Sequence, residues 1–289
     1  MGDTALSDAE VSTTTRIVAE AGQRPFLPLA FDALASIYRH RSEIRTLFMR
    51  DFNAALRRTR LGGWWNVINS LVPIFAYMIL NLTRVFNQAE GIHPAAYVAM
   101  GVTLWLLLSD TLTLPMLTAE RGGVAMNTAR LPVFATLFAG FGRIAFGLMV
   151  RLPVALGLVL WFHPVSLGSA LVGLLLLILG AIFFYGCGLI LCLLNLMLPD
   201  IRQGVMVALR YLIFVSGAVF PLNDVIFFDI FNMVNPFYIF IDATRATLVF
   251  GVGSGPASVW ILGVLGICLV VIGAGLVARL EPHIREAAR

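Results

Sequence analysis

Lysine is absent from this sequence, and all 20 basic residues of the 289 are arginine. The absence of lysine excludes a phosphate-binding loop of the G-x-x-x-x-G-K-[ST] type, a Schiff-base lysine and an S-x-x-K nucleophile pair. Charged residues are also scarce, at 12%, which is about half of what a soluble domain carries. Because hydrophobic residues make up 59%, we expect the bilayer to be the solvent for most of the chain.

Histidine and cysteine are few, with four and three copies. The histidines lie far apart and form no H-E-x-x-H motif, so we expect no metal site and no bound cofactor. The cysteines Cys187, Cys192 and Cys268 lie in apolar runs, which is typical of small buried side chains and not of a disulfide framework. The acidic residues are spread singly, which argues against a membrane-embedded glycosyl- or acyltransferase.

Six apolar runs are long enough to cross a bilayer, since one helical crossing needs roughly 20 residues. They are Trp64–Thr83, Ala95–Leu117, Leu137–Phe162, Ser166–Leu198, Val205–Leu222 and Pro256–Ala278. The fourth run carries no charge and is longer than one bilayer thickness, so it must tilt, kink or extend past the membrane. The expected fold class is an all-α integral membrane protein with six transmembrane helices.

Arginine is distributed unevenly between the two sides of these spans. Residues 1–62 hold nine arginines, and further arginines follow spans two, four and six. The opposite loops contain only Arg84 and Arg245. Because basic residues accumulate in cytoplasmic loops, both termini are predicted to be cytoplasmic, as in a multi-pass protein of a bacterial inner membrane.

The first 62 residues divide into two parts. Residues 1–30 are polar and lack the apolar region of a cleaved signal peptide, so we expect a disordered tail. Residues 31–62 are amphipathic at helical spacing and predict an interfacial helix with arginine at lipid phosphates. Such a helix is either a plain anchor or a lever that moves with a cytoplasmic partner. A transmembrane domain over 63–279 and a cytoplasmic tail over 280–289 complete the expected organisation.

The segment Asn223–Gly255, between spans five and six, is of a different kind. Its apolar pieces are too short to cross and are interrupted by polar residues, among them Asn235, Pro236, Asp242 and Arg245. These pieces predict short re-entrant helices that dip into the outer face of the membrane.

Charged side chains within the spans are the first candidates for a transport pathway, because burying a charge in lipid is costly. Arg151 lies in the middle of span three and Asp110 in the middle-to-outer half of span two. The two could pair across helices, which would be structural, or line a polar conduit. Tyr77, Trp105 and Tyr185 offer aromatic faces that suit sugar rings, although such residues more often meet lipid or the membrane interface.

The segment Ala119–Thr136, between spans two and three, is predicted to be cytoplasmic. It is longer than the roughly 2–8 residues that usually connect packed helices, and it has room for one short helix that a partner protein could contact. Its polar residues and its proline are candidates for that contact: Glu120, Arg121, Asn127, Arg130 and Pro132.

Four stretches resemble the membrane subunits of ABC exporters for capsular polysaccharide, O-antigen and teichoic acid. The first is Arg50-Asp51 with Arg60-Leu61-Gly62 and Trp65, ahead of span one. The others are Asn127…Leu131-Pro132-Val133 with Arg143; Leu198-Pro199-Asp200-Ile201 continuing to Ser216-Gly217…Phe220-Pro221; and Asn235-Pro236-Phe237-Tyr238 with Asp242 and Arg245. Together they extend over about residues 40–280.

The resemblance implies a homodimer in which each protomer contacts a separate ATPase subunit, so that ATP is bound by the partner and this chain is no enzyme. Arg50, Asp51 and the Glu120–Pro132 segment would transmit ATPase closure. The segment with Asn235, Pro236, Asp242 and Arg245 would gate the outer end of a conduit for lipid-linked polysaccharide. No nucleic acid partner is implied.

Two other transport classes remain as alternatives. A drug or lipid efflux permease has the same fold with a different cargo, because fold does not determine function. A proton-driven flippase usually shows more helices in internal repeats, and no repeat is evident. The motifs do not separate the capsule branch from the O-antigen branch, and they name neither the polysaccharide nor the ATPase.

Overall fold

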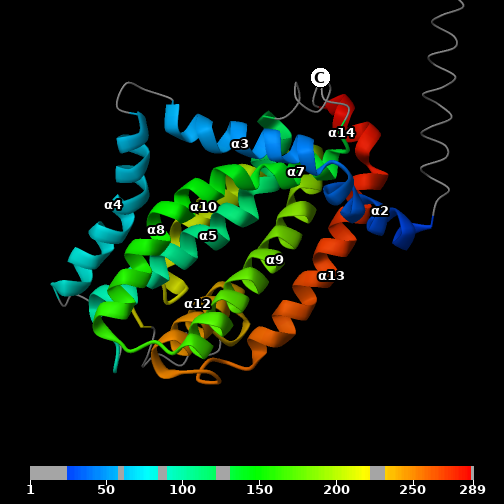
Figure 1. The fold of residues 1–289 in the computed structure, drawn as a ribbon. Helices are drawn as coiled ribbons and strands as arrows, with labels where there is room; N and C mark the ends of the chain where they lie inside the picture. Colours follow the sequence, from blue (N-terminus) through cyan, green and yellow to red (C-terminus); the bar gives the residue numbers. More distant parts are fainter. Residues whose placement is uncertain (1–24, 58–61, 84–89, 122–130, 222–231, 288–289) are drawn as a thin grey trace, which may run out of the picture.

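The structure is a computed structural model that describes residues 25–57, 62–83, 90–121, 131–221 and 232–287. Every element in these ranges is a helix, in agreement with the predicted all-α class. The long helices run side by side as a tilted bundle, with short helices gathered at its two ends (Figure 1). Parts of several predictions, including residues 1–24 and 122–130, lie outside the described residues.

Four segments in the described ranges are long and apolar enough to cross a membrane. They are α5 (Pro94–Arg121), the pair α7 (Val133–Ala139) and α8 (Phe141–Phe162), α9 (Leu167–Met197) and α13 (Ser258–Arg279). The 31 residues of α9 correspond to about 46 Å at 1.5 Å per residue. This length exceeds the hydrocarbon thickness, as the fourth apolar run predicts.

Helices α9 and α13 pack closely because small residues line their contact. A Cβ atom at Gly266 would lie 2.7 Å from the Cα of Phe183, and one at Gly186 would lie 2.7 Å from the Cβ of Leu269. A side chain at either position would push the helices apart. Small residues therefore allow the backbones to approach, as is common between membrane helices.

The first and fifth predicted spans differ from these four. Helix α4 (Gly62–Leu82) carries a shorter apolar stretch, Leu71–Leu80. The fifth span was predicted as one helix over Val205–Leu222, and this is wrong: α10 (Asp200–Leu212) begins earlier, continues as the 3-10 turn η1 (Ile213–Val215) and then ends. Gly217, with φ +65°, adopts a left-handed conformation that an α-helix cannot include. The count of six spans stays a prediction.

The amphipathic stretch forms two helices, not the single one predicted over 31–62. Helix α2 (Phe26–Arg39) starts five residues before that boundary, immediately after Pro25, and α3 (Arg41–Arg57) follows it. The junction is His40, whose ψ of 30° departs from helical geometry. Helix α3 lies across the ends of α7 and α8 (Figure 1), where the interfacial helix is expected.

The segment between α10 and α13 contains one continuous helix of 15 residues, α12 (Pro236–Phe250). The predicted interruptions at Asp242 and Arg245 do not occur, because a charged side chain breaks no backbone hydrogen bond. Asn235 and Pro236 instead begin the helix, as a cap and a first-turn proline do. Helix α12 lies at the end of the bundle opposite α3 (Figure 1), and its re-entrance stays a prediction.

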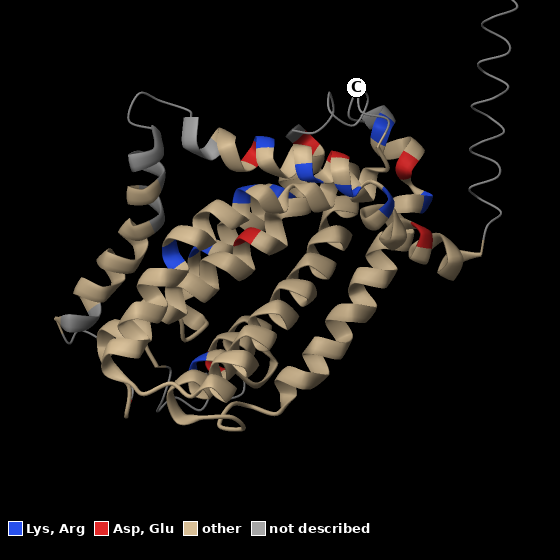
Figure 2. Ribbon diagram, viewed as in Figure 1, with Lys and Arg blue, Asp and Glu red and all other residues tan. Residues whose placement is uncertain are grey.

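Charged residues concentrate at one end of the bundle. Figure 2 shows most of them at the end formed by α2, α3 and the C-terminal helix α14 (Glu281–Ala287), with some inside the bundle and one small group on α12 at the other end. The first and last described helices therefore lie at the same end of the bundle. We call this the arginine-rich end.

Candidate functional site

An ion pair inside the bundle joins α5 to α8. The guanidinium Nη2 of Arg151 lies 3.1 Å from Oδ2 of Asp110, and its Nε donates to the carbonyl of Gly147 at 3.0 Å. The Arg151 side chain is 7% exposed, whereas that of Asp110 is 46% exposed. The structure thus shows the cross-helix pair that was one of the two alternatives for these residues.

Because Asp110 is partly exposed, its carboxylate can accept a hydrogen bond from a group outside the bundle while it is paired with Arg151. Neighbouring hydroxyls on α5, from Ser109, Thr111 and Thr113, donate to carbonyls of their own helix. Arg151 is the only partner of the Asp110 carboxylate among the described residues. The other carboxylate oxygen is available as an acceptor, while pairing offsets the cost of charge at this depth.

The three candidate aromatic residues do not gather around this pair. Trp105 is 3% exposed and its ring packs 4.3 Å from that of Phe237 on α12. Tyr77 on α4 meets the ring of Phe214 in η1 at 6.0 Å. Tyr185 is 4% exposed among the phenylalanines of α7 and α8. Trp105 and Tyr185 are therefore packed within the chain, and a role in contacting sugar stays a prediction.

At the arginine-rich end, α3 is tied to α8 by Asp51. Its carboxylate accepts from Nε and Nη2 of Arg143, at 3.1 and 3.0 Å, and from Arg50 at 3.2 Å. Asp51 is 12% exposed, so solvent screens its bond to Arg143 less than it would screen a surface pair. Residues 92 positions apart are thereby held together.

A second group at this end, the Glu120 cluster, ties α5 to α9 and α10. The Glu120 carboxylate accepts from Arg202 and from Nδ2 of Asn195, the latter at 3.1 Å. The Oδ1 of Asn195 accepts from the backbone N–H of Arg202 at 3.0 Å. Asn195 was not among the residues predicted from the sequence, although an amide inside the charge-free run Ser166–Leu198 is a signal that could have identified it.

The remaining coupling candidates lie in or beside the segment 122–130. Asn127 and Arg130 fall outside the described residues, as does the side chain of Arg121. Pro132 immediately precedes α7, and its carbonyl accepts from the backbone N–H of Thr136 at 3.1 Å. Arg285 on α14 donates to the carbonyl of Leu131, so the C-terminal helix contacts the residue that follows this segment, which the sequence did not predict.

At the opposite end, the turn at Gly217 connects to α12 and α5. Arg245 donates from Nη2 to the carbonyl of Gly217 at 2.9 Å, and the hydroxyl of Tyr97 donates to the same oxygen at 2.9 Å. The Arg245 guanidinium also lies 3.5 Å from the centre of the Tyr97 ring. Asn235 caps α12 through Oδ1 and donates from Nδ2 to Val215 at 3.2 Å. We call this group the Gly217 lock.

The Gly217 lock joins two of the outer-gate candidates, Asn235 and Arg245. Arg245 is 2% exposed and Asn235 5%. The Gly217 carbonyl, which Arg245 and Tyr97 bind, would otherwise lack a helical partner. Asp242 lies one turn before Arg245 on α12 and is half-buried. Tyr97 was not predicted as a functional residue, since a tyrosine near a span end is usually part of the interfacial belt.

A protein-family model described as ABC-2 type transporter matches residues 42–249. The chain belongs to this family. As an ABC-2 protein it is a membrane subunit of an ABC transporter and a multi-pass membrane protein, and the ATPase is a partner chain. A comparison with curated proteins finds no match.

The ABC-2 match begins within α3 and ends within α12. It therefore includes the Asp51–Arg143 contact, the Glu120 cluster, the Asp110–Arg151 pair and the Gly217 lock. Helices α13 and α14 lie beyond it. Within the described residues of this ABC-2 chain, no three histidine, cysteine, aspartate or glutamate side chains are placed to hold a metal ion.

Proposed function

We propose that this ABC-2 protein is the membrane subunit of an ATP-driven exporter that moves capsular polysaccharide or O-antigen-type glycan across a bacterial inner membrane. Two copies would form the pathway, each on a separate ATPase subunit, with both termini cytoplasmic. In this proposal ATP is bound by the partner, and this chain supplies the conduit and its two ends.

One observation carries the proposal: the stretches that resemble polysaccharide exporters meet in pairs. Asp51 of the first stretch bonds to Arg143 of the second. The Ser216-Gly217 turn of the third is bound by Asn235 and Arg245 of the fourth, through Val215 and Gly217. Motifs that are distant in sequence thus form two compact units, one at each end of the bundle. This arrangement supports the proposal that one unit is the coupling site and the other the outer gate.

The unit at the arginine-rich end suits mechanical coupling. Asp51 links the interfacial helix α3 to α8, and the Glu120 cluster links the end of α5 to α10. The segment 122–130 connects α5 to α7. In this proposal an ATPase that displaces it moves α5, α8 and α9, because the bonds of Asp51 and Glu120 join these helices at this end. Such charge-assisted bonds are about twice as strong as neutral ones. This supports α3 as a lever over the alternative of a plain anchor.

The pathway itself is proposed to run along the face that exposes Asp110. A glycan offers many hydroxyl donors, and a carboxylate with a free oxygen accepts them. The buried Arg151 holds this carboxylate in place. In this proposal α4 and the α10–η1 unit complete six crossings, and α12 covers the outer end as a re-entrant helix.

The test is an affinity pull-down of the solubilised chain from its native membrane, followed by mass spectrometry and an ATPase assay. A stoichiometric ATPase subunit is expected, together with loss of surface polysaccharide in a deletion strain. Normal surface polysaccharide combined with new sensitivity to a drug, or an altered lipid composition, would contradict the glycan cargo and favour a drug or lipid efflux permease. A chain that purifies without an ATPase would contradict the coupling scheme.

A further inference from the structure

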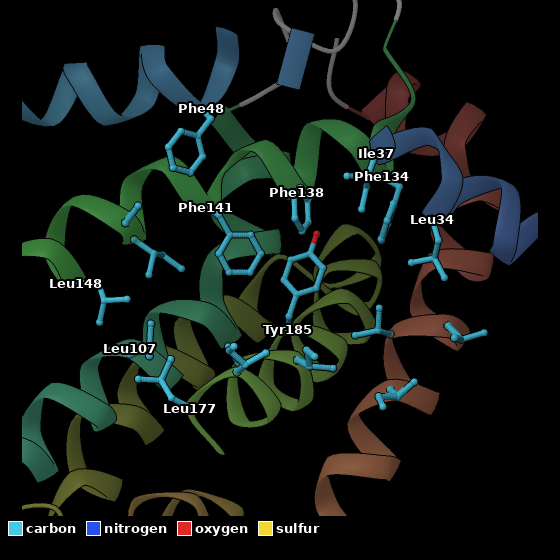
Figure 3. A pocket seen from close by; sticks show the side chains of 18 residues that line it. Leu34, Ile37, Phe48, Leu107, Phe134, Phe138, Phe141, Leu148, Leu177 and Tyr185 are labelled. Atoms are coloured by element: carbon cyan, nitrogen blue, oxygen red, sulfur yellow. The ribbon is translucent and has the colours of Figure 1, made fainter. Parts of the chain in front are cut away.

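An apolar groove of about 590 Å³ opens in the bundle below α2 and α3 (Figure 3). Its walls come from α7, α8, α9 and α13, and its inner end from Leu107 on α5. The lining side chains are hydrocarbon or aromatic, and Tyr185 carries the one hydroxyl among them. Ile178 on α9 and Ile267 on α13, which line it, are 46% and 50% exposed, so the groove is open along these two helices, towards the region that lipid occupies.

The Tyr185 hydroxyl is a second, independent feature of this groove. Tyr185 is 4% exposed, and its hydroxyl oxygen has no hydrogen-bond partner among the described residues. Figure 3 shows the hydroxyl pointing towards Phe138, beside Phe141. A buried hydroxyl without a partner costs about 1–3 kcal/mol. An occupant that brings a hydrogen-bond acceptor to this place would remove that cost.

Water does not suit the groove. A buried water needs 2–4 polar partners, and the groove offers a single hydroxyl. An empty groove of this size would also lose dispersion contacts along its whole lining. Hydrocarbon chains fill such a space readily, and the volume falls within the range of roughly 300–1,000 Å³ for ligand sites.

Hydrocarbon alone provides no preference, because lipid tails are as apolar as the lining. A preference requires the polar part of the occupant. On α3, Arg41 and Arg45 precede the lining residue Phe48 by seven and three residues, which places all three on one helical face. Both arginines are exposed, and neither has an ion-pair partner among the described residues. Basic residues at a membrane surface attract anionic lipid by about 1 kcal/mol each.

We propose that this groove binds one anionic diacyl glycerophospholipid of the leaflet at the arginine-rich end. Its acyl chains lie along Ile178, Ile182 and Val271, an ester carbonyl accepts from Tyr185, and the phosphate meets Arg41 and Arg45. The lining of the groove does not include Asp110 or Arg151, and the bound lipid packs α2 and α3 against α8 and α13. This inference does not depend on the cargo of the exporter.

The test uses the full chain reconstituted with its ATPase in vesicles of phosphatidylethanolamine and phosphatidylglycerol, with a phosphatidylglycerol that carries a diazirine on one acyl chain. After irradiation, peptides are mapped by mass spectrometry. We expect adducts on the peptides of α9 and α13 that line the groove. Absence of adducts there would overturn the proposal.

A matched pair of variants on α13 provides the control. Val271→Phe fills the groove, whereas Val264→Phe makes the same change two turns away, where Val264 is 64% exposed and lines no groove. The phenyl ring takes up space that an acyl chain would occupy, so Val271→Phe should lower groove labelling about fivefold or more, and Val264→Phe should leave it unchanged. Equal labelling of the two variants would contradict the assignment.

The head group is tested separately. Arg41→Gln with Arg45→Gln should lower labelling by the phosphatidylglycerol probe about thirtyfold, since two arginines at about 1 kcal/mol each contribute about 2 kcal/mol, and should not change labelling by a phosphatidylcholine probe. Equal labelling by both probes in the native chain would overturn the anionic preference. Displacement of the probe by an equimolar polyprenyl phosphate would reassign the groove to an isoprenoid carrier.

Discussion

At the scale of residues, the informative side chains are arginines whose charge is buried inside the bundle. Arg151 is 7% exposed and Arg245 is 2% exposed, and each is held by oxygen acceptors on a different helix or turn. The sequence singled out Arg151 because charge within an apolar run is costly, and Arg245 because its segment resembles the outer segment of polysaccharide exporters. It did not name the partners with certainty, since Asp110 and Gly217 are distant in sequence and only packing brings them close.

The Gly217 lock predicts a stability effect. In Arg245→Met the carbonyl of Gly217 keeps only the Tyr97 hydroxyl, and the cation–π contact is lost, so thermal unfolding in detergent should occur at lower temperature. The loss should be about 2–3 kcal/mol for the charged hydrogen bond. Tyr97→Phe removes one neutral hydrogen bond and should cost about 1 kcal/mol or less. Equal effects of the two variants would show that Arg245 is not the centre of the lock.

The Asp110–Arg151 pair predicts a difference between single and double variants. Arg151→Ala should impair export without disturbing assembly with the ATPase, because the conduit carboxylate loses its support. If the pair served only packing, the uncharged combination Asp110→Asn with Arg151→Gln would restore surface polysaccharide, since no unpaired charge remains. We expect this double variant to stay defective in export although it is as stable as the native chain. Normal surface polysaccharide in either variant would contradict a conduit role.

At the scale of elements, helices begin where the sequence carries a capping residue or a proline. The Asn235-Pro236 pair begins α12, and Pro25 precedes α2. The fifth span was predicted as one helix because Val205–Leu222 is apolar, but the Gly217 turn ends it. The turn cannot be predicted from the apolar pattern, because Tyr97 and Arg245 from other helices stabilise the conformation of Gly217.

The link between α3 and α8 predicts uncoupling. Asp51→Asn removes the charge that accepts from Arg143, so displacement of α3 should no longer reach α8. We expect ATP hydrolysis by the reconstituted complex to continue while export falls about tenfold, as 1.4 kcal/mol would produce. Asp32→Asn is the control, because its bond to Arg39 joins two side chains that are 59% and 52% exposed and contributes little. An equal fall in both variants would contradict the lever role of α3.

At the scale of the whole molecule, the distribution of arginine and the end-to-end arrangement of the helices agree. Helices α2 and α14 lie at the same end (Figure 2), which an even number of crossings requires. Among the residues that the structure describes, four segments satisfy the length and apolar character of a span. The six-crossing proposal therefore depends on α4 and the α10–η1 unit.

Cysteine accessibility tests these crossings in intact cells. In a chain without its three native cysteines, new cysteines at Glu90 and Ser254 should react with a membrane-impermeant maleimide from outside. New cysteines at Asp200 and His283 should react only after the membrane is opened. All four positions are exposed. Outside labelling at Asp200, or protection at Ser254, would show that the α10–η1 unit does not cross.

The sequence by itself determined the membrane class, the absence of lysine-dependent chemistry, the long spans and the arginine asymmetry, because these depend on composition and local hydropathy. Only the tertiary structure decided that Asp51 meets Arg143, that Asn195 and Arg202 meet Glu120, that Gly217 ends the fifth run and that an apolar groove forms around Tyr185. The physical reason is that these features are contacts between helices. Their energy comes from burial and pairing of groups distant in sequence, which local patterns do not contain.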